Sequence, residues 1–401
     1  MKSKINYGSQ FIDDKDIRSV SNSLKERLIT TGKNVIRFEN NLKKKLKCNY
    51  VISCSSATSG LHLAYMSINL KKDDVILMPA INFISSFSMA QKMNAKVYLV
   101  DIDPETGQIN SETIKDCIKK NKIKKIKALI TMYLGGFIFD NKEIIQLKKK
   151  YNFYIIEDSC HALGARYKSN NKVYNIGSCF HSDISVFSFH PVKSITTGEG
   201  GAITTNSKLI YNKIITLRSH GIVKGKTKYW DYDIKDISYN YRLSDLNCAL
   251  GVSQLKKLDH FILRRKKIFQ IYEKEFLGIK NIKLINSNNF RNAYHLVVLN
   301  LNFKILRKNK DQLFKYLINY NIYPQYHYIP IYKFSFNKKY SKKNYPGAEE
   351  YHKSSLTLPI HVNLSNLQIK YEFLSNLVVG LRWTSNSYKQ EAKSACLLHL
   401  W

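Results

Sequence analysis

One stretch decides the fold of this chain, and it reads Ser185-Val-Phe-Ser-Phe-His-Pro-Val-Lys193-Ser-Ile-Thr-Thr-Gly-Glu-Gly-Gly201-Ala-Ile-Thr-Thr205. Its apolar start predicts a strand that delivers Lys193 into a loop, and its glycines predict a tight turn before a second strand. These glycines lack the G-x-G-x-x-G spacing of a dinucleotide site. In a chain this rich in lysine, a lone lysine is by default a surface residue. Small and apolar neighbours between two strands instead favour a depressed pKa and Schiff-base chemistry at Lys193.

The regions before this stretch alternate between strand-like and helical patterns. Short apolar runs predict strands at residues 51–53, 75–78, 97–100, 128–132 and 154–156, with a lysine-rich helix over 141–150. This alternation predicts an α/β fold with a mainly parallel central sheet and helices on both faces. Ligands of such sheets bind at the carboxyl ends of the strands.

The pattern changes after about residue 245. Long helices are predicted over Leu246–Leu258 and Phe261–Phe276, followed by a strand over Ala293–Leu301. We therefore expect a large domain over residues 1–250 and a smaller C-terminal α/β domain over 251–380. Residues 381–401 lack a clear period and are expected to form an atypical tail.

The chain is strongly basic, with 64 lysine and arginine residues against 30 aspartate and glutamate residues and a formal net charge of +34. Such a charge can indicate a nucleic-acid or membrane-binding protein. The lysines are spread along the chain, however, and no aromatic-interleaved patch or base-reading motif accompanies them. A solvated basic surface is the favoured interpretation, and it would attract a phosphorylated substrate.

The seven cysteines and the absence of targeting signals favour a cytoplasmic protein. The cysteines show no C-x-x-C pair and no histidines at zinc-ligand spacing, so buried free thiols are expected, as in a reducing compartment. No signal peptide or stretch long enough to span a membrane is recognised. No metal site is predicted.

Two further segments carry chemically distinctive residues. In Tyr154-Ile-Ile-Glu-Asp158-Ser-Cys-His161-Ala-Leu-Gly164, Asp158 follows an apolar strand, where it could pair with a cationic ligand group or cap a helix. Asp158 and His161 lack further ligands at metal spacing. Ser53-Cys-Ser-Ser-Ala-Thr-Ser-Gly60 precedes a helix, so its hydroxyl and N–H groups could bind a phosphate or simply cap that helix.

Together these segments resemble the DegT-type sugar aminotransferases, a fold-type-I family that uses pyridoxal 5'-phosphate. The resemblance covers roughly residues 5–375. It is carried by four motifs, which are Ser188-Phe-His-Pro-Val-Lys-Ser-Ile-Thr-Thr-Gly-Glu-Gly-Gly201, Tyr239-Asn-Tyr-Arg-Leu-Ser-Asp245, Ser56-Ala-Thr-Ser-Gly-Leu-His-Leu-Ala64 and Glu157-Asp-Ser-Cys-His-Ala-Leu-Gly164.

The resemblance implies roles for the residues around the cofactor ring. Lys193 would bind the cofactor covalently and later shuttle protons, and Asp158 would pair with the pyridine nitrogen. Phe83 matches the aromatic residue that stacks on the ring, and His161 matches a Gln or His beside it. Without the resemblance, Phe83 would be a core residue, and His161 and His190 would be satisfied buried imidazoles.

The resemblance also implies a phosphate site and a homodimer. Thr58, the Ala57 amide and Ser188 would hold the cofactor phosphate. Asn240 matches a residue that reaches this phosphate from the partner subunit, so each active site would be shared between two subunits.

Two other stretches resemble the transaminases of the pseudaminic-acid pathway, namely Ala249-Leu-Gly-Val-Ser-Gln-Leu-Lys-Lys-Leu-Asp259 and Gln325-Tyr-His-Tyr-Ile-Pro-Ile-Tyr332. Those enzymes transfer an amino group from glutamate, which leaves as 2-oxoglutarate, to C4 of a UDP-linked 4-keto-6-deoxy-N-acetylhexosamine. His327 and Tyr7 would then lie near the nucleotide sugar. The alternatives are amination at C3, and a sugar dehydratase, a branch that usually has His in place of the lysine. From another class, the alternative is a regulatory or nucleic-acid-binding protein.

The sequence departs from the family pattern at two places. The run Met132-Tyr-Leu-Gly-Gly136 lacks a His that often precedes the Tyr-Gly, and Ser159-Cys160 replaces the usual pair of alanines. Both departures could tune the pocket.

Overall fold

The computed structural model describes residues 4–138, 142–169, 171–225, 227–228, 230–279, 281–286, 291–304, 309–337, 340 and 344–370. The predicted tail at 381–401 lies outside these residues.

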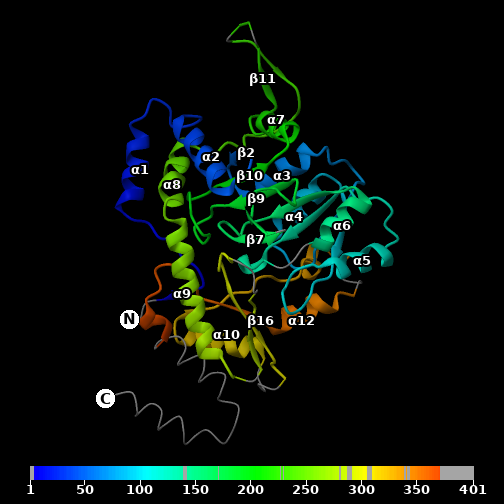
Figure 1. Ribbon diagram of the computed structural model, residues 1–401, viewed down its shortest axis with the longest axis vertical. Helices are drawn as coiled ribbons and strands as arrows, with labels where there is room; N and C mark the ends of the chain where they lie inside the picture. Colours follow the sequence, from blue (N-terminus) through cyan, green and yellow to red (C-terminus); the bar gives the residue numbers. More distant parts are fainter. Residues whose placement is uncertain are drawn as a thin grey trace, which may run out of the picture.

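The centre of the protein is a seven-stranded sheet with the order β2-β10-β9-β6-β5-β3-β4 (Figure 1). Six strands run parallel, and β10 runs antiparallel to both of its neighbours, because it returns directly from β9. The strands are β2 (Tyr50–Cys54), β3 (Val75–Pro79), β4 (Lys96–Val100), β5 (Ala128–Met132), β6 (Tyr154–Asp158), β9 (Ile184–Ser188) and β10 (Gly201–Thr205).

Helices cover both faces of this sheet. On β2 and β10, Val51 and Ala202 belong to one buried cluster, while their chain neighbours Ile52 and Ile203 belong to another. Successive side chains of a strand point to opposite faces, so the two clusters lie on opposite sides of the sheet. The covering helices are α2 (Lys33–Leu46), α3 (Ala57–Ser67), α4 (Ser85–Lys92), α5 (Ser111–Lys120), α6 (Lys142–Tyr151), α7 (Lys208–Leu217) and α8 (Asp245–Leu255), and α1 (Asp14–Leu24) packs against α8.

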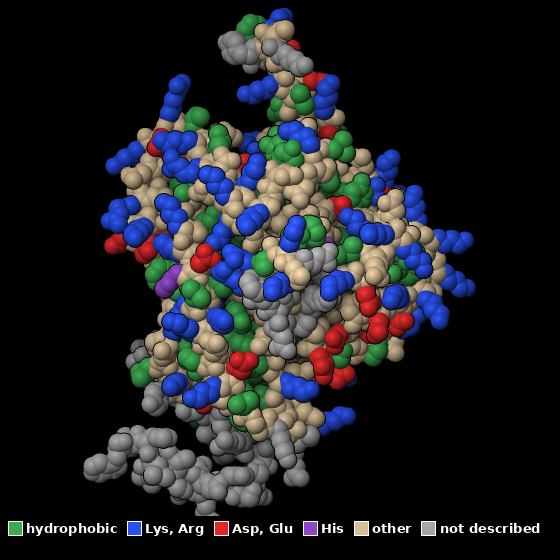
Figure 2. Space-filling model, in the orientation of Figure 1, with side chains coloured by type: hydrophobic (Ala, Val, Ile, Leu, Met, Phe, Trp, Pro, Cys, Tyr) green, Lys and Arg blue, Asp and Glu red, His purple; other side chains and the backbone are tan. Residues whose placement is uncertain are grey.

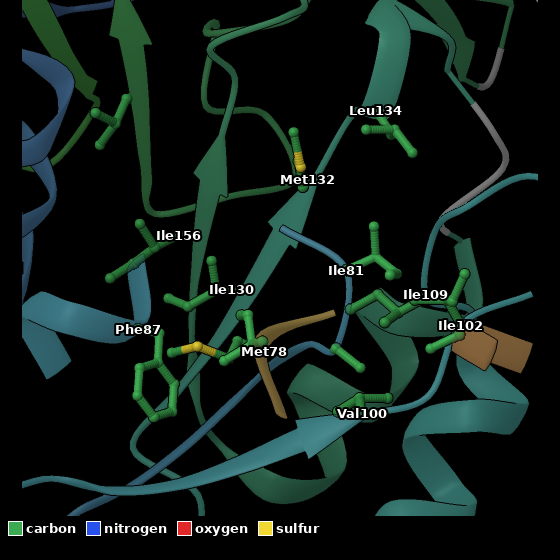
Figure 3. Close-up of a cluster of buried hydrophobic side chains, with 14 of the residues drawn as sticks. Met78, Ile81, Phe87, Val100, Ile102, Ile109, Ile130, Met132, Leu134 and Ile156 are labelled. Carbon is green, nitrogen blue, oxygen red and sulfur yellow. The ribbon is translucent and has the colours of Figure 1, made fainter. Parts of the chain in front are cut away.

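The larger cluster packs strand side chains against a helix. Met78, Ile130 and Ile156, from three neighbouring strands, gather with Phe87 of α4, and all four are buried (Figure 3). Burying apolar side chains of this size stabilises a fold by roughly 1.5–3 kcal/mol each. The predicted α/β architecture, with a mainly parallel sheet covered on both faces, is confirmed.

A second, smaller sheet follows the long helix α9 (Leu258–Phe276), which runs away from the main sheet (Figure 1). This sheet is antiparallel and has the order β13-β14-β16. The elements of this part are β13 (Ile282–Leu284), β14 (Val297–Leu301), α10 (Lys310–Asn319), β15 (Ile322–Tyr323), the 3-10 turns η2 (Ile331–Lys333) and η3 (Ser335–Asn337), α12 (Pro346–Ser354) and β16 (Ser355–Leu358). The N-terminal strand β1 (Ile5–Asn6) pairs with β15. The domain boundary at residue 250 stays a prediction, and it falls within α8.

Two predicted element boundaries are wrong. The first long helix ends at Leu255 and Leu258 starts α9, because the chain turns at Lys257, whose N–H donates to Gln254 O at 2.9 Å. The strand predicted from Ala293 starts only at Val297. Residues 293–296 bond instead to the 3-10 turn η1 (Leu134–Gly136), with His295 N donating to Gly135 O at 2.9 Å.

Two hairpins complete the fold, β7 (Arg166–Ser169) with β8 (Lys172–Asn175), and β11 (Ile222–Lys224) with β12 (Tyr232–Ile234). The β11–β12 hairpin projects from the body of the protein (Figure 1). Its exposed side chains include Trp230 and Tyr232.

Lysine and arginine side chains are scattered over the face shown in Figure 2 rather than gathered in one patch. In the described part of the chain, no helix combines the length and the apolar character needed to cross a membrane. The six cysteines described are free thiols; five are buried, and Cys160 is half-buried.

A buried carboxylate joins two of the covering helices. Asp245, at the start of α8, accepts hydrogen bonds from the backbone N–H groups of Asn34 (2.9 Å) and Val35 (3.1 Å) and from the Asn34 side chain (2.8 Å). The N-cap residue of α2 is Gly32, which has no side chain to do this. A Cβ there would lie 2.9 Å from the Asp245 carboxyl carbon. Asp245 therefore caps α2 from another helix.

We expect Asp245→Ala to lower the free energy of unfolding by about 2–4 kcal/mol, because it removes a helix cap and leaves buried donors without partners. Urea unfolding followed by circular dichroism measures this loss. The control Asp116→Ala removes an exposed carboxylate from α5 and should change stability by at most about 0.5 kcal/mol. Equal losses in the two variants would contradict the capping role.

Candidate active site

Lys193 lies in the loop between β9 and β10, at the carboxyl end of β9. The loop is held by hydrogen bonds from Phe189 N to Gly200 O (2.8 Å) and from Lys193 N to His190 O (2.9 Å). Gly198 adopts a φ of 78°, which favours glycine. Burial lowers the pKa of the Lys193 ammonium, and the nearby Cys160 and Asp158 side chains partly oppose this shift. The lysine is therefore both fixed in place and closer to a neutral amine than a surface lysine.

Asp158 ends β6, the strand next to β9. Its backbone pairs in register with Val186 of β9, so Asp158 and the Lys193 loop lie at the same edge of the sheet. The side chain is 3% exposed and accepts hydrogen bonds from Ser86 Oγ and Cys160 N, both at 3.3 Å. Its negative charge partly opposes the lowering of the Lys193 pKa by burial.

His161 lies between two other aromatic side chains. Its ring centroid is 4.3 Å from that of His295 and 6.0 Å from that of Tyr328. Gly135 N donates to His161 Nδ1 at 3.3 Å, so the ring proton belongs on Nε2, which lies 3.0 Å from the Tyr328 hydroxyl. Burial lowers the pKa of His161 well below its usual value, and Lys193 lowers it further.

Tyr7 and His327, the predicted substrate residues, lie together beside this cluster. Their ring centroids are 5.2 Å apart. His327 Nδ1 lies 2.9 Å from Thr357 Oγ1. Burial, and secondarily Lys193, lowers the pKa of His327 to about 3. Both predicted residues thus share the surroundings of Lys193.

The predicted phosphate residues lie at the start of α3 and the end of β9. Ser56 caps α3 and accepts from Ser59 N at 3.1 Å, so the capping interpretation is confirmed for Ser56. Ala57 and Thr58 follow it in the first helical turn, where backbone N–H groups have no carbonyl partner within the helix. Thr58 Oγ1 lies 2.7 Å from Ser85 Oγ, and Ser188 is half-buried at the end of β9.

Close packing brings these parts together. A Cβ on Gly201, the first residue of β10, would lie 2.7 Å from the Ala57 nitrogen and 2.6 Å from the Ser56 carbonyl carbon. Glycine at this position therefore allows the Lys193 loop and the start of α3 to approach each other.

Two of the predicted site residues, Phe83 and Asn240, are exposed. The Phe83 side chain is 54% exposed, with its ring centroid 5.8 Å from that of Tyr328, so the core interpretation of Phe83 is wrong. Asn240 is exposed, and its side chain accepts from Arg242 N at 3.3 Å. Its predicted role concerns the partner subunit. His190 is also exposed, so the buried-imidazole interpretation of that residue is wrong.

Sequence reasoning missed Tyr328, His295 and Arg265. Tyr328 is one of 27 tyrosines, and its position next to His327 is the one feature of the sequence that could have identified it. Arg265 belongs to a helix rich in lysine and arginine, and it is 2% exposed and donates to His295 O (3.2 Å) and Ile360 O (3.0 Å). Within the described ranges, no group of three or more His, Cys, Asp and Glu side chains could hold a metal ion.

The buried imidazoles generate a pH prediction. Burial lowers the pKa of His161, His295 and His327. The folded protein keeps these rings neutral, while the unfolded chain takes up protons at about pH 6.5. The free energy of unfolding is therefore unaffected by the titration of these rings above about pH 6.5. As the pH falls from there toward the pKa values of the rings in the folded protein, each ring lowers the free energy of unfolding by up to about 1.4 kcal/mol per pH unit.

We expect the free energy of urea unfolding to fall between about pH 6.5 and pH 5, and His327→Gln to make this fall less steep. The control His190→Gln replaces an exposed imidazole and should leave the slope unchanged. An unaltered slope in His327→Gln would show that this ring does not stay neutral in the folded state.

Comparison with known proteins identifies the family of this chain. The sequence model of the DegT/DnrJ/EryC1/StrS aminotransferase family matches residues 10–372. The UDP-4-amino-4,6-dideoxy-N-acetyl-beta-L-altrosamine transaminase of Campylobacter jejuni subsp. jejuni serotype O:23/36 is 38% identical over 368 residues, covering 92% of this chain and 95% of the relative.

Two solved structures are similar over nearly their whole length. Helicobacter pylori PseC, an aminotransferase involved in the biosynthesis of pseudoaminic acid, matches with a TM-score of 0.84 and 26% identity, covering 96% of this chain and 100% of PseC. A sugar aminotransferase from Streptococcus pneumoniae in its PLP form matches with a TM-score of 0.84 and 25% identity, covering 94% and 99%. The predicted fold-type-I architecture is thereby confirmed. The chain belongs to the DegT/DnrJ/EryC1/StrS aminotransferase family.

Proposed function

We propose that this protein is a pyridoxal-phosphate-dependent transaminase that moves an amino group from L-glutamate to C4 of a UDP-linked 4-keto-6-deoxy-N-acetylhexosamine. The product would be a precursor of a pseudaminic-acid-type or other surface amino sugar. The observation that carries this proposal is a lysine with a lowered pKa beside a buried aspartate, at the carboxyl edge of the sheet. The C. jejuni relative and the H. pylori structure support the substrate class through their names.

The residues present fit the cofactor. The Asp158 carboxylate is buried, accepts two long hydrogen bonds, and can also pair with a protonated pyridine nitrogen. Lys193 supplies the amine, the exposed Phe83 ring supplies a stacking surface, and the first turn of α3 with Ser188 supplies donors to a phosphate. When bound, pyridoxal phosphate supplies an aldehyde for amine condensation and an electron sink.

Lys193 is the group that would hold and move the proton of the substrate carbon. Its lowered pKa raises the fraction of neutral amine, which can accept a proton from the substrate carbon and return it. Tyr328 and His161 form a hydrogen-bonded pair beside Lys193. Because His161 stays neutral, this pair can orient a substrate through polar contacts without adding a charge.

The alternatives differ in what they require of these residues. A sugar dehydratase of this fold usually has His at the lysine position, so Lys193 disfavours it. Amination at C3 needs the same cofactor residues and differs in how the sugar is held. Tyr7 and His327 are the residues that we propose near the nucleotide sugar.

The free thiols of the described chain support a cytoplasmic location.

We expect Lys193→Ala to lower the rate of amino transfer by at least about a thousandfold, because the variant loses both the covalent attachment and the proton carrier. The purified variant should also lack the visible absorbance that glutamate bleaches in the unaltered enzyme. Lys266→Ala, which removes an exposed lysine of α9, is the control and should keep both properties.

Product analysis tests the position of the reaction. An amine at C4 of the sugar, found by NMR, supports the proposal, whereas an amine at C3 or a deoxygenated sugar would select one of the alternatives. An unaltered protein that no amino donor bleaches would refute the transaminase proposal.

We also propose that two subunits form each active site. Trp230, Tyr232 and Ile237 are exposed by 65%, 62% and 90% on and beside the projecting β11–β12 hairpin, just before Asn240 in the sequence. Exposed apolar groups clustered in this way are typical of protein interfaces. A second copy of the chain that covers them would bring its Asn240 near the other subunit's phosphate site.

Co-expression of two inactive variants tests the shared site. We expect Lys193→Ala and Asn240→Ala subunits to be inactive or weak alone. A mixed dimer should regain activity, because one of its sites combines an intact Lys193 with the partner's intact asparagine. If Asn240 served its own subunit, no site of the mixed dimer would be complete and activity would not rise.

A further inference from the structure

A cavity lies among the elements around the smaller sheet, and none of the residues that line it belongs to the predicted cofactor site. Its volume is about 650 Å³, and residues from α10, η2, α12 and the segment on either side of His327–Tyr328 form its walls. Four lysines line it, with one carboxylate, that of Asp311. The four are Lys304, Lys310, Lys333 and Lys353.

Most of this positive charge has no carboxylate partner. Lys333 pairs with Glu349 of α12 at 2.9 Å, and Asp311 accepts a hydrogen bond from the Tyr326 hydroxyl at 3.3 Å. Among the residues that the structure describes, Lys304, Lys310 and Lys353 have no carboxylate within ion-pair distance. The cavity therefore carries an excess of positive charge.

Lys310 is fixed in the cavity wall, unlike a mobile surface lysine. Its ammonium donates to His352 O at 2.5 Å and lies 4.0 Å from the centroid of the Tyr326 ring. Burial, opposed by Asp311 and aided by Lys333, lowers the pKa of Lys310 to about 7. In its protonated form, held by a carbonyl and an aromatic face, the amine keeps N–H groups free for an anion, and an anion beside it favours that form.

The positive charge of the cavity lysines also affects the pKa of His352. Burial, together with Lys310 and Lys333, lowers its pKa to about 4. Its Nδ1 atom is buried and lacks a hydrogen-bond partner within the described chain. Buried polar atoms usually have a partner, so this atom can accept a hydrogen bond from, or donate one to, a water or a ligand.

The start of α10 adds a further anion-binding feature. This ten-residue helix begins in the cavity wall, where Asn309 caps it by accepting from Gln312 N at 2.9 Å. The positive end of the helix dipole therefore lies in the cavity wall, where the Asp311 carboxylate of the first turn offsets part of it. Phe303 and Ile329 supply an apolar side to the same cavity.

We propose that this cavity binds a phosphorylated small molecule, with its phosphate beside Lys310, Lys304 and Lys353 and its apolar part against Ile329. A phosphate group offers the several acceptor oxygens that clustered ammonium groups and helix N–H groups need. The size of the cavity suits a nucleotide. This site is separate from the sugar site proposed above.

The test measures the acylation rate of each lysine in the holoenzyme by peptide mass spectrometry, with UDP, inorganic pyrophosphate or uridine present. We expect UDP and pyrophosphate to slow the labelling of Lys310 by about tenfold at saturation. Uridine, which lacks a phosphate, should give no protection. UDP bound only in the sugar site would leave the labelling of Lys310 unchanged, which separates this proposal from the proposed function.

Matched variants locate the effect. Lys304→Gln with Lys353→Gln removes two exposed cavity lysines, whereas Lys266→Gln with Lys267→Gln removes the same charge from the exposed side of α9. We expect the first pair to raise the concentration of pyrophosphate needed to protect Lys310 by about tenfold. The second pair should leave it unchanged. Protection by uridine, no protection by any probe, or an equal effect of both pairs would overturn the proposal.

Discussion

The pairing of β6 with β9 is the interaction on which the site depends. Because Asp158 lies opposite Val186 in this parallel ladder, the carboxylate and the start of the Lys193 loop leave the sheet at the same edge. The antiparallel return of β10 then closes the loop, since Gly201 pairs with Ser188. The missing Cβ of Gly201 also allows the first turn of α3 to reach this edge. One set of strand pairings thus positions an amine, a carboxylate and an anion-binding helix end.

Two consecutive carboxylates show how the sheet separates structural from chemical roles. Glu157 points away from Asp158, and it accepts hydrogen bonds from Tyr133 at 2.6 Å and from Ser185. Burial raises its pKa. Asp158 has only the two longer hydrogen bonds at 3.3 Å, so it keeps acceptor capacity. A buried carboxylate with unused acceptors is stabilised by a nearby cation, which both Lys193 and a protonated ring nitrogen can supply.

Local pattern predicted the central sheet and the residues that follow its strands, because apolar runs and loop glycines determine both. Contacts between distant segments were not predictable in this way. His295 reaches His161 because the chain before Val297 bonds to η1, and no local pattern distinguishes that loop from a longer strand. Arg265 is a buried residue of the lysine- and arginine-rich helix α9, and no local pattern distinguishes it from the exposed basic residues around it. Asn240 was found only through family resemblance, since its predicted role needs a second chain.

The electrostatics of the pocket leave the lysine as the proton carrier near neutral pH. Burial lowers the pKa of the neighbouring imidazoles, so they remain neutral, and it raises the pKa of Tyr328 and Cys160, so they keep their protons. The same burial lowers the Lys193 pKa, which favours a neutral amine, while Cys160 and Asp158 limit the shift. A group that must both take up and release a proton works best when its pKa lies near the working pH. Burial therefore keeps His161, His327, Tyr328 and Cys160 from competing with Lys193 for the proton near neutral pH.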